Sequence, residues 1–155
     1  MGPPASGAKI AAVLTEIVPP DTHLAFEAMR ELRPHLESRE AFVDVVDREQ
    51  RPLGYRMVAV LPDTGGPAQS VAGFRLGTSL SWGRHLYVDD LVTLPIARGR
   101  GHAAQLLSWV TDEAVRLGCR EVHLDSAVGL SRADAHRLYL NNGFVIAAHH
   151  FRQEL

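Results

Sequence analysis

Two arginines and two glycines separate a strand-like stretch from a helix-like stretch, at Arg98, Gly99, Arg100 and Gly101. The apolar stretch before them ends at Pro95, which cannot continue a hydrogen-bonded ladder. The residues from Ala103 onward favour a helix. The first N–H groups of a helix have no partner within it and lie at the positive end of its dipole, so they attract anions. Glycine allows close approach to the backbone, and arginine adds positive charge. The stretch therefore predicts a site for a phosphate or pyrophosphate.

Three other interpretations of this stretch are less favoured. A P-loop requires G-x-x-x-x-G-K-[ST], and Lys9 is the only lysine of the chain. The spacing Gly99-x-Gly101-x-x-Ala104 fits a dinucleotide-binding fingerprint, with Asp125 about 20 residues further on. However, four residues separate the strand from the first glycine, and only one further strand–helix unit follows. The third interpretation is a helix start that binds no ligand.

Two adjacent aspartates, Asp89 and Asp90, lie within the predicted strand that leads to this loop. A carboxylate buried in a sheet costs several kcal/mol unless it is paired or hydrogen-bonded. Because adjacent strand residues face opposite sides, we expect one aspartate on each face of the sheet. One of them is a candidate to anchor a cation or to accept a proton. The alternative, at equal weight, is a salt bridge to an arginine.

Two motifs together resemble the GCN5-related N-acetyltransferase (GNAT) superfamily. The segment Arg98-Gly99-Arg100-Gly101-His102-Ala103 is similar to the family pattern R/Q-x-x-G-x-G/A. The segment 135–144, AHRLYLNNGF, resembles the pattern A-x-x-x-Y-x-x-x-G-F. The two occur in the right order and roughly 30 residues apart, which is more specific than either motif alone. The match is good over residues 86–146, and before them only the order of elements agrees.

The resemblance implies that acetyl-coenzyme A binds at the loop and along the preceding strand. In the family, the strands equivalent to 86–94 and 121–127 splay apart, and the pantetheine arm lies between them. Backbone groups of Val92 and Leu94 are expected to bind that arm and to polarise the thioester carbonyl. The implied cofactor-binding residues are Val92, Thr93, Leu94, Arg98, Gly99, Arg100, Gly101, His102 and Ala103.

The same resemblance implies a general acid at Tyr139. A phenol with a pKa of about 10 is protonated at neutral pH and can donate to a departing thiolate. The alternative is a tyrosine that only packs against the sheet. One position departs from the family, because Arg132 occupies the place where an asparagine often contacts the pantetheine arm.

An alkyl amine also has a pKa of about 10, so its proton must be removed before it can attack. Asp90 or Asp89 is the candidate base. The predicted function is therefore transfer of an acetyl group from acetyl-CoA to an amine of a small molecule or peptide, by direct attack in a ternary complex. The alternative is a non-catalytic coenzyme A sensor or partner module on the same fold.

Composition limits the class of protein. The 155 residues are 46% hydrophobic and 22% charged, with a net charge of −2, which predicts one domain and does not suggest a nucleic-acid partner. No apolar run approaches the length of a membrane span, and the single Cys119 excludes a disulfide framework, so we expect a cytoplasmic protein. The adjacent His149 and His150 cannot chelate together on a strand, and no metal is expected.

Periodicity and turn residues predict a flexible tail over 1–8 and one domain over 9–155, which the resemblance implies is acetyltransferase-like. Strands are expected at 10–18, 53–61, 69–76, 85–94, 121–127 and 144–151. Helices are expected at 21–33, from Ser38, at 102–118 and at 131–140. This order predicts an α+β fold with a central mixed, mostly antiparallel sheet. The resemblance implies that its parallel strand pair is splayed and that helices lie on both faces. Dimerisation through the last strand is a further possibility.

Overall fold

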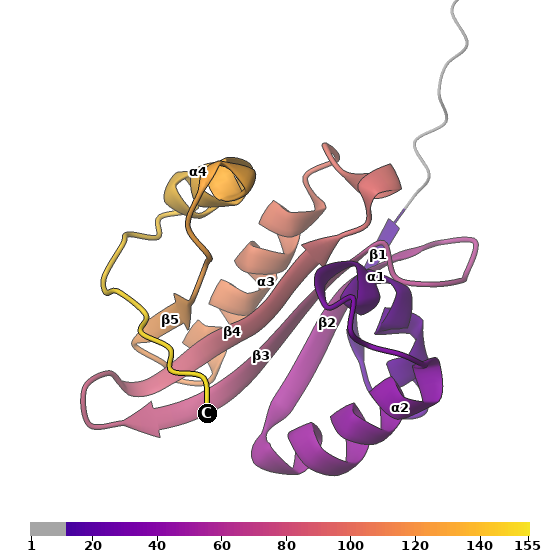
Figure 1. Cartoon of the computed structure of the whole chain (residues 1–155), viewed down its shortest axis with the longest axis horizontal. Helices are drawn as coiled ribbons and strands as arrows, with labels where there is room; N and C mark the ends of the chain where they lie inside the picture. Colours follow the sequence, from indigo (N-terminus) through magenta and orange to yellow (C-terminus); the bar gives the residue numbers. More distant parts are fainter. Residues whose placement is uncertain (1–11) are drawn as a thin grey trace, which may run out of the picture.

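The computed structural model describes residues 12–155, which form a five-stranded sheet in the order β1-β2-β3-β4-β5 (Figure 1). Neighbouring strands are antiparallel, except that β4 and β5 are parallel. The predicted mixed sheet is thus confirmed, and the predicted tail over 1–8 lies outside the described residues. The strands are β1 (Ala12–Ile17), β2 (Tyr55–Pro62), β3 (Ser70–Ser79), β4 (Gly83–Thr93) and β5 (Glu121–Leu124).

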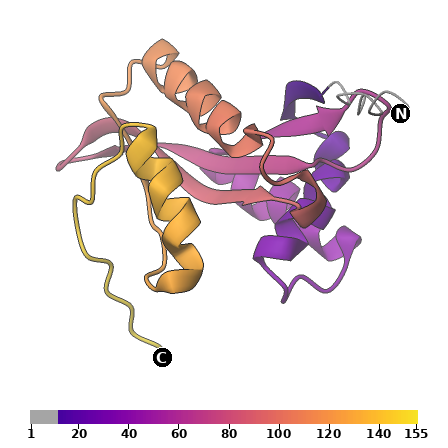
Figure 2. The ribbon, with the colours of Figure 1, turned by 90° about the horizontal axis from the view of Figure 1, so that it is seen from above.

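Helices cover both faces of this sheet, as predicted. In Figure 2, α3 lies on one side of the sheet and α1 and α2 lie on the other. The helix α4 lies at the β5 end of the sheet, away from α1 and α2 (Figures 1 and 2). The α-helices are α1 (Phe26–Leu32), α2 (Arg39–Asp44), α3 (His102–Arg116) and α4 (Ala133–Asn141). Shorter helical turns are η1 (Asp21–Ala25), η2 (Val45–Gln50), η3 (Arg51–Leu53), η4 (Pro95–Ala97) and η5 (Leu130–Arg132).

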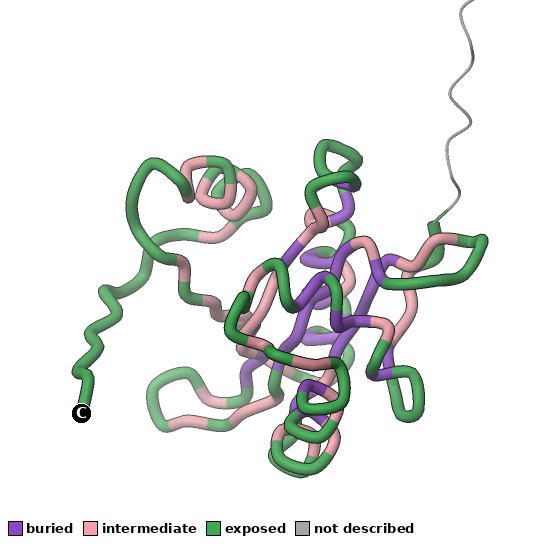
Figure 3. The backbone as a smooth tube through the Cα atoms, turned by 45° about the vertical axis from the view of Figure 1, so that its right-hand side comes forward, coloured by how far each residue is buried: buried purple, intermediate pink, exposed green. Residues whose placement is uncertain are grey.

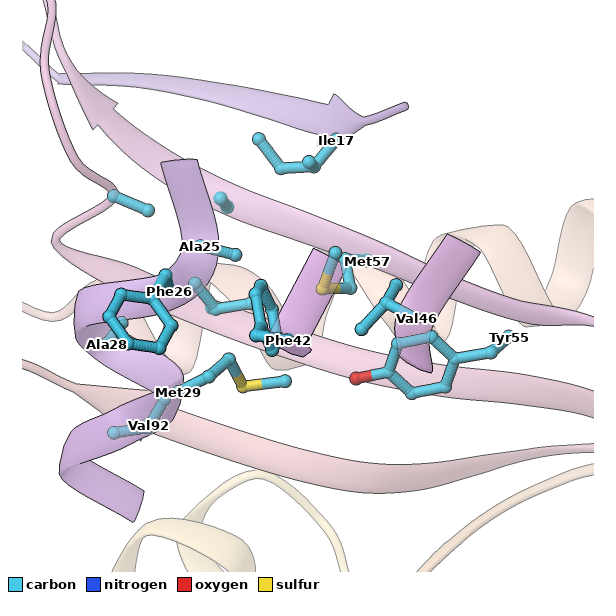
Figure 4. Packing of buried hydrophobic residues seen from close by; sticks show 13 residues of the cluster. Ile17, Ala25, Phe26, Ala28, Met29, Phe42, Val46, Tyr55, Met57 and Val92 are labelled. Carbon is cyan, nitrogen blue, oxygen red and sulfur yellow. The ribbon is translucent and has the colours of Figure 1, made fainter. Parts of the chain in front are cut away.

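Each face of the sheet has its own hydrophobic core. Under α1 and α2, Phe26, Phe42, Tyr55 and Met57 pack together (Figure 4). Under α3, a second cluster is built around Phe74, with Leu86, Leu106 and Val110 among its members. Buried residues are concentrated in the central strands, whereas most residues after α4 are exposed (Figure 3). Burial of two independent apolar clusters fixes the sheet between its helical layers.

Local sequence signals explain where several helices begin and end. The hydroxyl of Ser38 accepts a hydrogen bond from the Ala41 amide at 3.1 Å, which is an N-cap and confirms the predicted start of α2. After Asp44 the helix continues as the wider π-type turns of η2. Gly118 follows α3 with φ of 71°, a left-handed conformation that suits glycine at a helix end.

The predicted strand over 144–151 is wrong, and β5 is shorter than predicted. Within the described chain, β5 spans only Glu121–Leu124 and pairs only with β4. The residues after α4 carry no strand, and Val145, Ile146 and Phe151 are exposed. A strand gains stability when its side chains pack on a sheet face, and these side chains are not packed on one. The apolar, β-branched composition of residues 144–151 therefore predicted a strand that does not form.

Candidate active site

The predicted anion loop joins η4 to α3. Gly99 has φ of 75° and Gly101 has φ of 81°, values in the left-handed region that other residues avoid. Within the described chain, a Cβ built at either glycine meets nothing within 4 Å. The turn therefore requires glycine for its backbone conformation, and it leaves the backbone of both residues open.

The amides of this loop are unpaired within residues 12–155. Gly101 is the N-cap of α3 and has no side chain to accept from the first amides of the helix. No amide of residues 99–103 donates a backbone hydrogen bond in this part of the chain. Several N–H groups and the positive end of a 15-residue helix thus meet at one place. This arrangement fits the pyrophosphate group that the sequence predicts.

The charged side chains of the loop have partners of their own. Arg98 donates to the Thr93 carbonyl and pairs with Glu31, both at 3.3 Å. Arg100 donates to the Ile96 carbonyl at 3.2 Å. Both arginines remain exposed, so they keep positive charge near the loop. His102 is buried, and its side chain adds no exposed charge.

The edge of β4 that faces β5 is only partly paired. The parallel ladder ends at Val88 and Leu124, so among the described residues 89–93 of β4 have no strand partner on that side. The Leu94 amide donates toward β3, to Gln69 at 2.9 Å, and the Val92 carbonyl accepts from the Ser70 hydroxyl of β3 at 2.8 Å. Backbone groups alternate in direction along a strand.

It follows that the groups of β4 directed to the open edge belong to Leu91 and Thr93. The backbone groups of Val92 and Leu94, which the sequence analysis favoured for the cofactor, instead form hydrogen bonds on the β3 side. The cause is the register of β4 against β3, in which Val92 pairs with Val71. This one-residue offset was not visible in the sequence.

Asp89 and Asp90 lie on the same face of the sheet, contrary to the expectation that they face opposite sides. The register between β3 and β4 pairs Gly73 with Asp90 and Phe74 with Val88, which leaves Asp89 as the extra residue of a β-bulge. A bulge breaks the strict alternation of a strand. Both carboxylates therefore point to the side of α1 and α2.

The two aspartates are held by residues from other elements. Asp90 accepts from the Tyr55 hydroxyl at 2.8 Å and from Arg33 at 2.9 Å. Asp89 accepts two hydrogen bonds from Arg75, both of 2.7 Å. The hydrogen bonds that Arg75 donates to Asp89 raise the pKa of Arg75. Burial raises the pKa of Tyr55, and the neighbouring charge of Asp90 raises it further. The predicted alternative of a salt bridge is thus found for both carboxylates.

These paired groups line an open pocket rather than a closed core. The pocket has a volume of about 480 Å³, and Asp89, Asp90, Arg33, Arg75, Gln50 and Leu53 line it. A second pocket of about 320 Å³ shares Arg33, Gln50 and Asp90 with it. The remaining lining of this second pocket is mostly apolar, with Met29, Leu36, Phe42, Val45, Val46, Tyr55 and His35.

Tyr139 lies on α4, outside both pockets. Its ring packs against Phe144 with a centroid distance of 6.1 Å. Burial raises the pKa of Tyr139, so its hydroxyl keeps its proton at neutral pH. The structure therefore does not bring Tyr139 into contact with the two aspartates, although it leaves the phenol in the protonated form that an acid requires.

Other chemistry is less supported by the described residues. In residues 12–155, no group of three His, Cys, Asp or Glu side chains is placed to hold a metal ion. Cys119 packs against the α3-side core, and burial raises the pKa of its thiol, which disfavours a nucleophilic thiolate. Within the same residues, no helix is long and apolar enough to cross a membrane.

Sequence reasoning missed four polar residues of the two pockets, namely Arg33, Gln50, Tyr55 and Arg75. Arg33 directly follows α1, the other three lie in η2, β2 and β3, and nothing in their local sequence marks them. One indirect signal was present, because two aspartates in a central strand require partners. That signal predicts arginines without saying which of the many arginines in the chain they are.

Comparison with known proteins gives matches along most of the chain. The model of the Acetyltransferase (GNAT) family matches residues 11–144. An uncharacterized N-acetyltransferase of Bacillus subtilis, YhdJ, is 32% identical over 130 residues, which cover 83% of this chain and 88% of that protein. The aminoalkylphosphonate N-acetyltransferase of Salmonella typhimurium is 38% identical over 65 residues, covering 42% of this chain and 40% of the relative.

The fold is also shared with solved structures. An acetyltransferase of Trypanosoma brucei superposes with a TM-score of 0.78, at 20% identity. The superposition covers 94% of this chain and all of the trypanosome chain. At that identity the likeness concerns the fold, and it agrees with the sheet order and helical layers described above.

Proposed function

Because this chain belongs to the acetyltransferase (GNAT) family, we propose that it is an acetyl-CoA-dependent N-acetyltransferase acting on a small-molecule amine. The observation that carries the proposal is the anion loop, with its two left-handed glycines and its unpaired amides at the start of α3. Bound there, acetyl-CoA supplies an acyl group activated as a thioester. The amides of residues 99–103 bind its pyrophosphate, and Arg98 and Arg100 add charge attraction.

The unpaired edge of β4 is the second part of the proposed cofactor site. The backbone groups of Leu91 and Thr93 point to the opening between β4 and β5 and are suited to bind a pantetheine amide or a thioester carbonyl. Val92 and Leu94 position this edge through their bonds on the β3 side. Ala103 and His102 contribute through their amides.

In this proposal the acceptor amine binds in the pocket lined by Asp89 and Asp90, beside the open edge of β4. Asp90 directly precedes Leu91 on β4, so a group bound to its carboxylate lies close to the proposed thioester position. Asp90, supported by Asp89, binds the ammonium and accepts its proton, and Tyr139 donates the proton that the departing thiolate needs. Burial raises the pKa of the Cys119 thiol, which disfavours an acyl-cysteine intermediate and supports direct transfer in a ternary complex. The name of the Salmonella relative supports a small-molecule acceptor rather than a peptide.

The first experiment tests the cofactor site by titration calorimetry with acetyl-CoA. We expect Gly101→Glu to weaken binding by about 100-fold or more, because a carboxylate enters the anion site and the left-handed backbone disfavours a side chain. Gly65→Glu is the matched control, since Gly65 has the same φ of 81° and the same open surroundings, but lies in the β2–β3 turn. Equal affinities of the two variants, or no binding by the native chain at millimolar acetyl-CoA, contradict the proposal.

The second experiment tests catalysis. Tyr139→Phe is expected to slow acetylation by about 100-fold while acetyl-CoA affinity is retained. An unchanged rate removes Tyr139 from the mechanism. Tight cofactor binding without acetylation of any amine in a broad panel favours the non-catalytic sensor instead.

A further inference from the structure

The pocket that contains Asp89 and Asp90 carries balanced charge. Two arginines and two aspartates line it, together with Gln50 and Leu53, so its formal charge is zero. An acceptor with several positive charges is repelled by the two guanidinium groups of this pocket. An acceptor with a single positive charge gives those guanidinium groups no new partner. A pocket with this lining complements a molecule that carries both signs.

The two signs are also separated by depth. The side chains of Asp90 and Asp89 are 11% and 24% exposed, whereas those of Arg33 and Arg75 are 46% and 49% exposed. The carboxylates thus form the floor of the pocket and the guanidinium groups form its rim. A ligand placed between them meets negative charge on the inner side and positive charge on the outer side.

Each arginine still has donors to offer. Arg33 uses Nε and Nη2 on Asp90 and on the Asp89 carbonyl, and Arg75 uses Nε and Nη2 on Asp89. Within the described chain, neither Nη1 has a hydrogen-bond partner in this network. A guanidinium group held on one side by a carboxylate keeps its outer N–H groups in a fixed direction, which suits a second, planar or tetrahedral anion.

The adjoining apolar pocket adds a third feature. It meets the charged pocket at Arg33, Gln50 and Asp90, and its walls include Met29, Phe42 and Val46. A ligand whose amine lies on Asp90 can place an apolar substituent there while its acid group faces the rim.

From these observations we propose that the acceptor is a small zwitterion, an amino acid or aminophosphonic acid with an apolar substituent, whose ammonium binds Asp90 and whose anion binds Arg33 and Arg75. This inference rests on the proposed function and specifies its acceptor. The carboxylate and the phosphonate share the chemistry that the rim recognises. The covalent change is that of the proposed function: the nitrogen–acyl bond forms, the thioester bond breaks, and the amine proton leaves through the carboxylate.

The test compares acceptors that differ only in the acid group. The full chain is assayed at saturating acetyl-CoA with leucine, its phosphonic acid analogue, 3-methylbutylamine and spermidine. We expect kcat/KM to be at least about 10-fold higher for one or both zwitterions than for 3-methylbutylamine, which is leucine without its carboxylate. The ratio between leucine and its analogue identifies which anion is bound.

Arginine variants then distinguish recognition from support of the aspartates. Arg33→Gln and Arg75→Gln are each expected to lower kcat/KM for the preferred zwitterion by about 10-fold more than for 3-methylbutylamine, because only the zwitterion also loses the partner of its acid group. Arg30→Gln, within α1 and outside both pockets, is the matched control for Arg33→Gln. An arginine that only supports an aspartate lowers both rates equally, and that result overturns the assignment of the rim.

The outcomes separate this inference from the proposed function. Acetylation of 3-methylbutylamine or spermidine as efficient as that of the zwitterions overturns the zwitterion proposal and leaves the transferase function standing. No acetylation of any acceptor, with acetyl-CoA bound, overturns both.

Discussion

The two faces of the sheet carry similar charged networks that differ in their surroundings. On the α3 side, Arg56 pairs with Glu16 and Glu113, and Glu113 also pairs with Arg116, at distances of 2.6–2.7 Å. On the other side, Arg33 and Arg75 pair with Asp90 and Asp89 at 2.9 and 2.7 Å. The bond lengths are alike, yet only the second set lines the 480 Å³ pocket described above.

Burial of the central arginine distinguishes the two networks, because the side chain of Arg56 is 27% exposed, less than those of Arg33 and Arg75. The Glu113 side chain is 8% exposed, and Arg56 lies over the Phe74 ring with its Cζ 5.2 Å from the ring centroid. This network connects β1, β2 and α3 and leaves little of Glu113 free. The arginines of the pocket network are about half exposed, so they can bind another molecule. Ion pairs of the same type therefore connect packed elements on one face and line an open pocket, the proposed acceptor site, on the other.

The largest effect is expected from neutralising Glu113, and Asp89 of the pocket network provides the comparison. Glu113→Gln should lower the free energy of unfolding by about 3 kcal/mol, because it leaves Arg56 and Arg116 without their buried partner. Asp89→Asn should lower it by less than about 1 kcal/mol, because its pair with Arg75 is near solvent. Urea unfolding of both variants measures the difference. Equal losses would show that the two networks do not differ in the way proposed.

The pH dependence of stability tests the same buried network. Hydrogen bonds from Arg116 and Arg56 lower the pKa of Glu113 from its ordinary 4.5 to about 2. A folded-state pKa below the unfolded value stabilises the fold above the unfolded value. The native chain should therefore exceed Glu113→Gln in stability above pH 4.5, and this advantage should disappear as pH falls through about 2. Thermal unfolding of both proteins across this range gives the comparison, and a constant difference contradicts it.

Gly73→Ala should have the next largest effect, by disturbing the pocket face from within the sheet. A Cβ at Gly73 lies 1.9 Å from the Tyr55 hydroxyl and 2.5 Å from its Cζ, and Tyr55 is fully buried. Tyr55 must shift, which costs about 2 kcal/mol of unfolding free energy and moves its hydroxyl from Asp90. Gly99→Ala is the control: its methyl group lies in open space, so its loss of about 1 kcal/mol comes only from a side chain at the left-handed φ of 75°. A loss no greater than that of the control would mean that the strands separate to admit the methyl group.

A smaller effect than that of Gly73→Ala is expected for Tyr55→Phe. Removing the hydroxyl deletes one hydrogen bond to Asp90, while Arg33 remains, so unfolding should become easier by about 1 kcal/mol. Because the aspartate loses one of its two supports, KM for the amine should change more than acetyl-CoA affinity. Measuring KM for the amine and the dissociation constant for acetyl-CoA checks this expectation. A change in acetyl-CoA affinity alone would contradict the placement of the amine on Asp90.

Local sequence features predicted most of the elements and the glycine turn before α3. The glycines at 99 and 101 act through their own backbone, and the amides they expose belong to the same few residues. Ser38 likewise marks its helix by a bond to a residue three positions on. Such features depend on neighbours in the chain, so the sequence is sufficient to identify them.

The acceptor pocket could not be predicted in the same way. Arg33 meets Asp90 across 57 positions of the chain, and Tyr55 meets it across 35. The sides on which Asp89 and Asp90 lie, and the strand edge that Thr93 offers, depend on the register of β4 against β3, which no local pattern specifies. The strand expected after Gly143 failed for a related reason, because pairing depends on a partner edge as well as on composition.

The bulge at Asp89 also has a consequence for insertions and deletions. In an ordinary strand, loss of one residue reverses every side chain on one side of the gap, so cores seldom survive it. Here Asp89 is the surplus residue between Val88 and Asp90, which already pair with adjacent positions of β3. A chain lacking Asp89 would retain the orientation of every other β4 residue and lose only one carboxylate. The sheet thus contains a position where length can vary without altering its core, next to the pocket that we propose binds the acceptor.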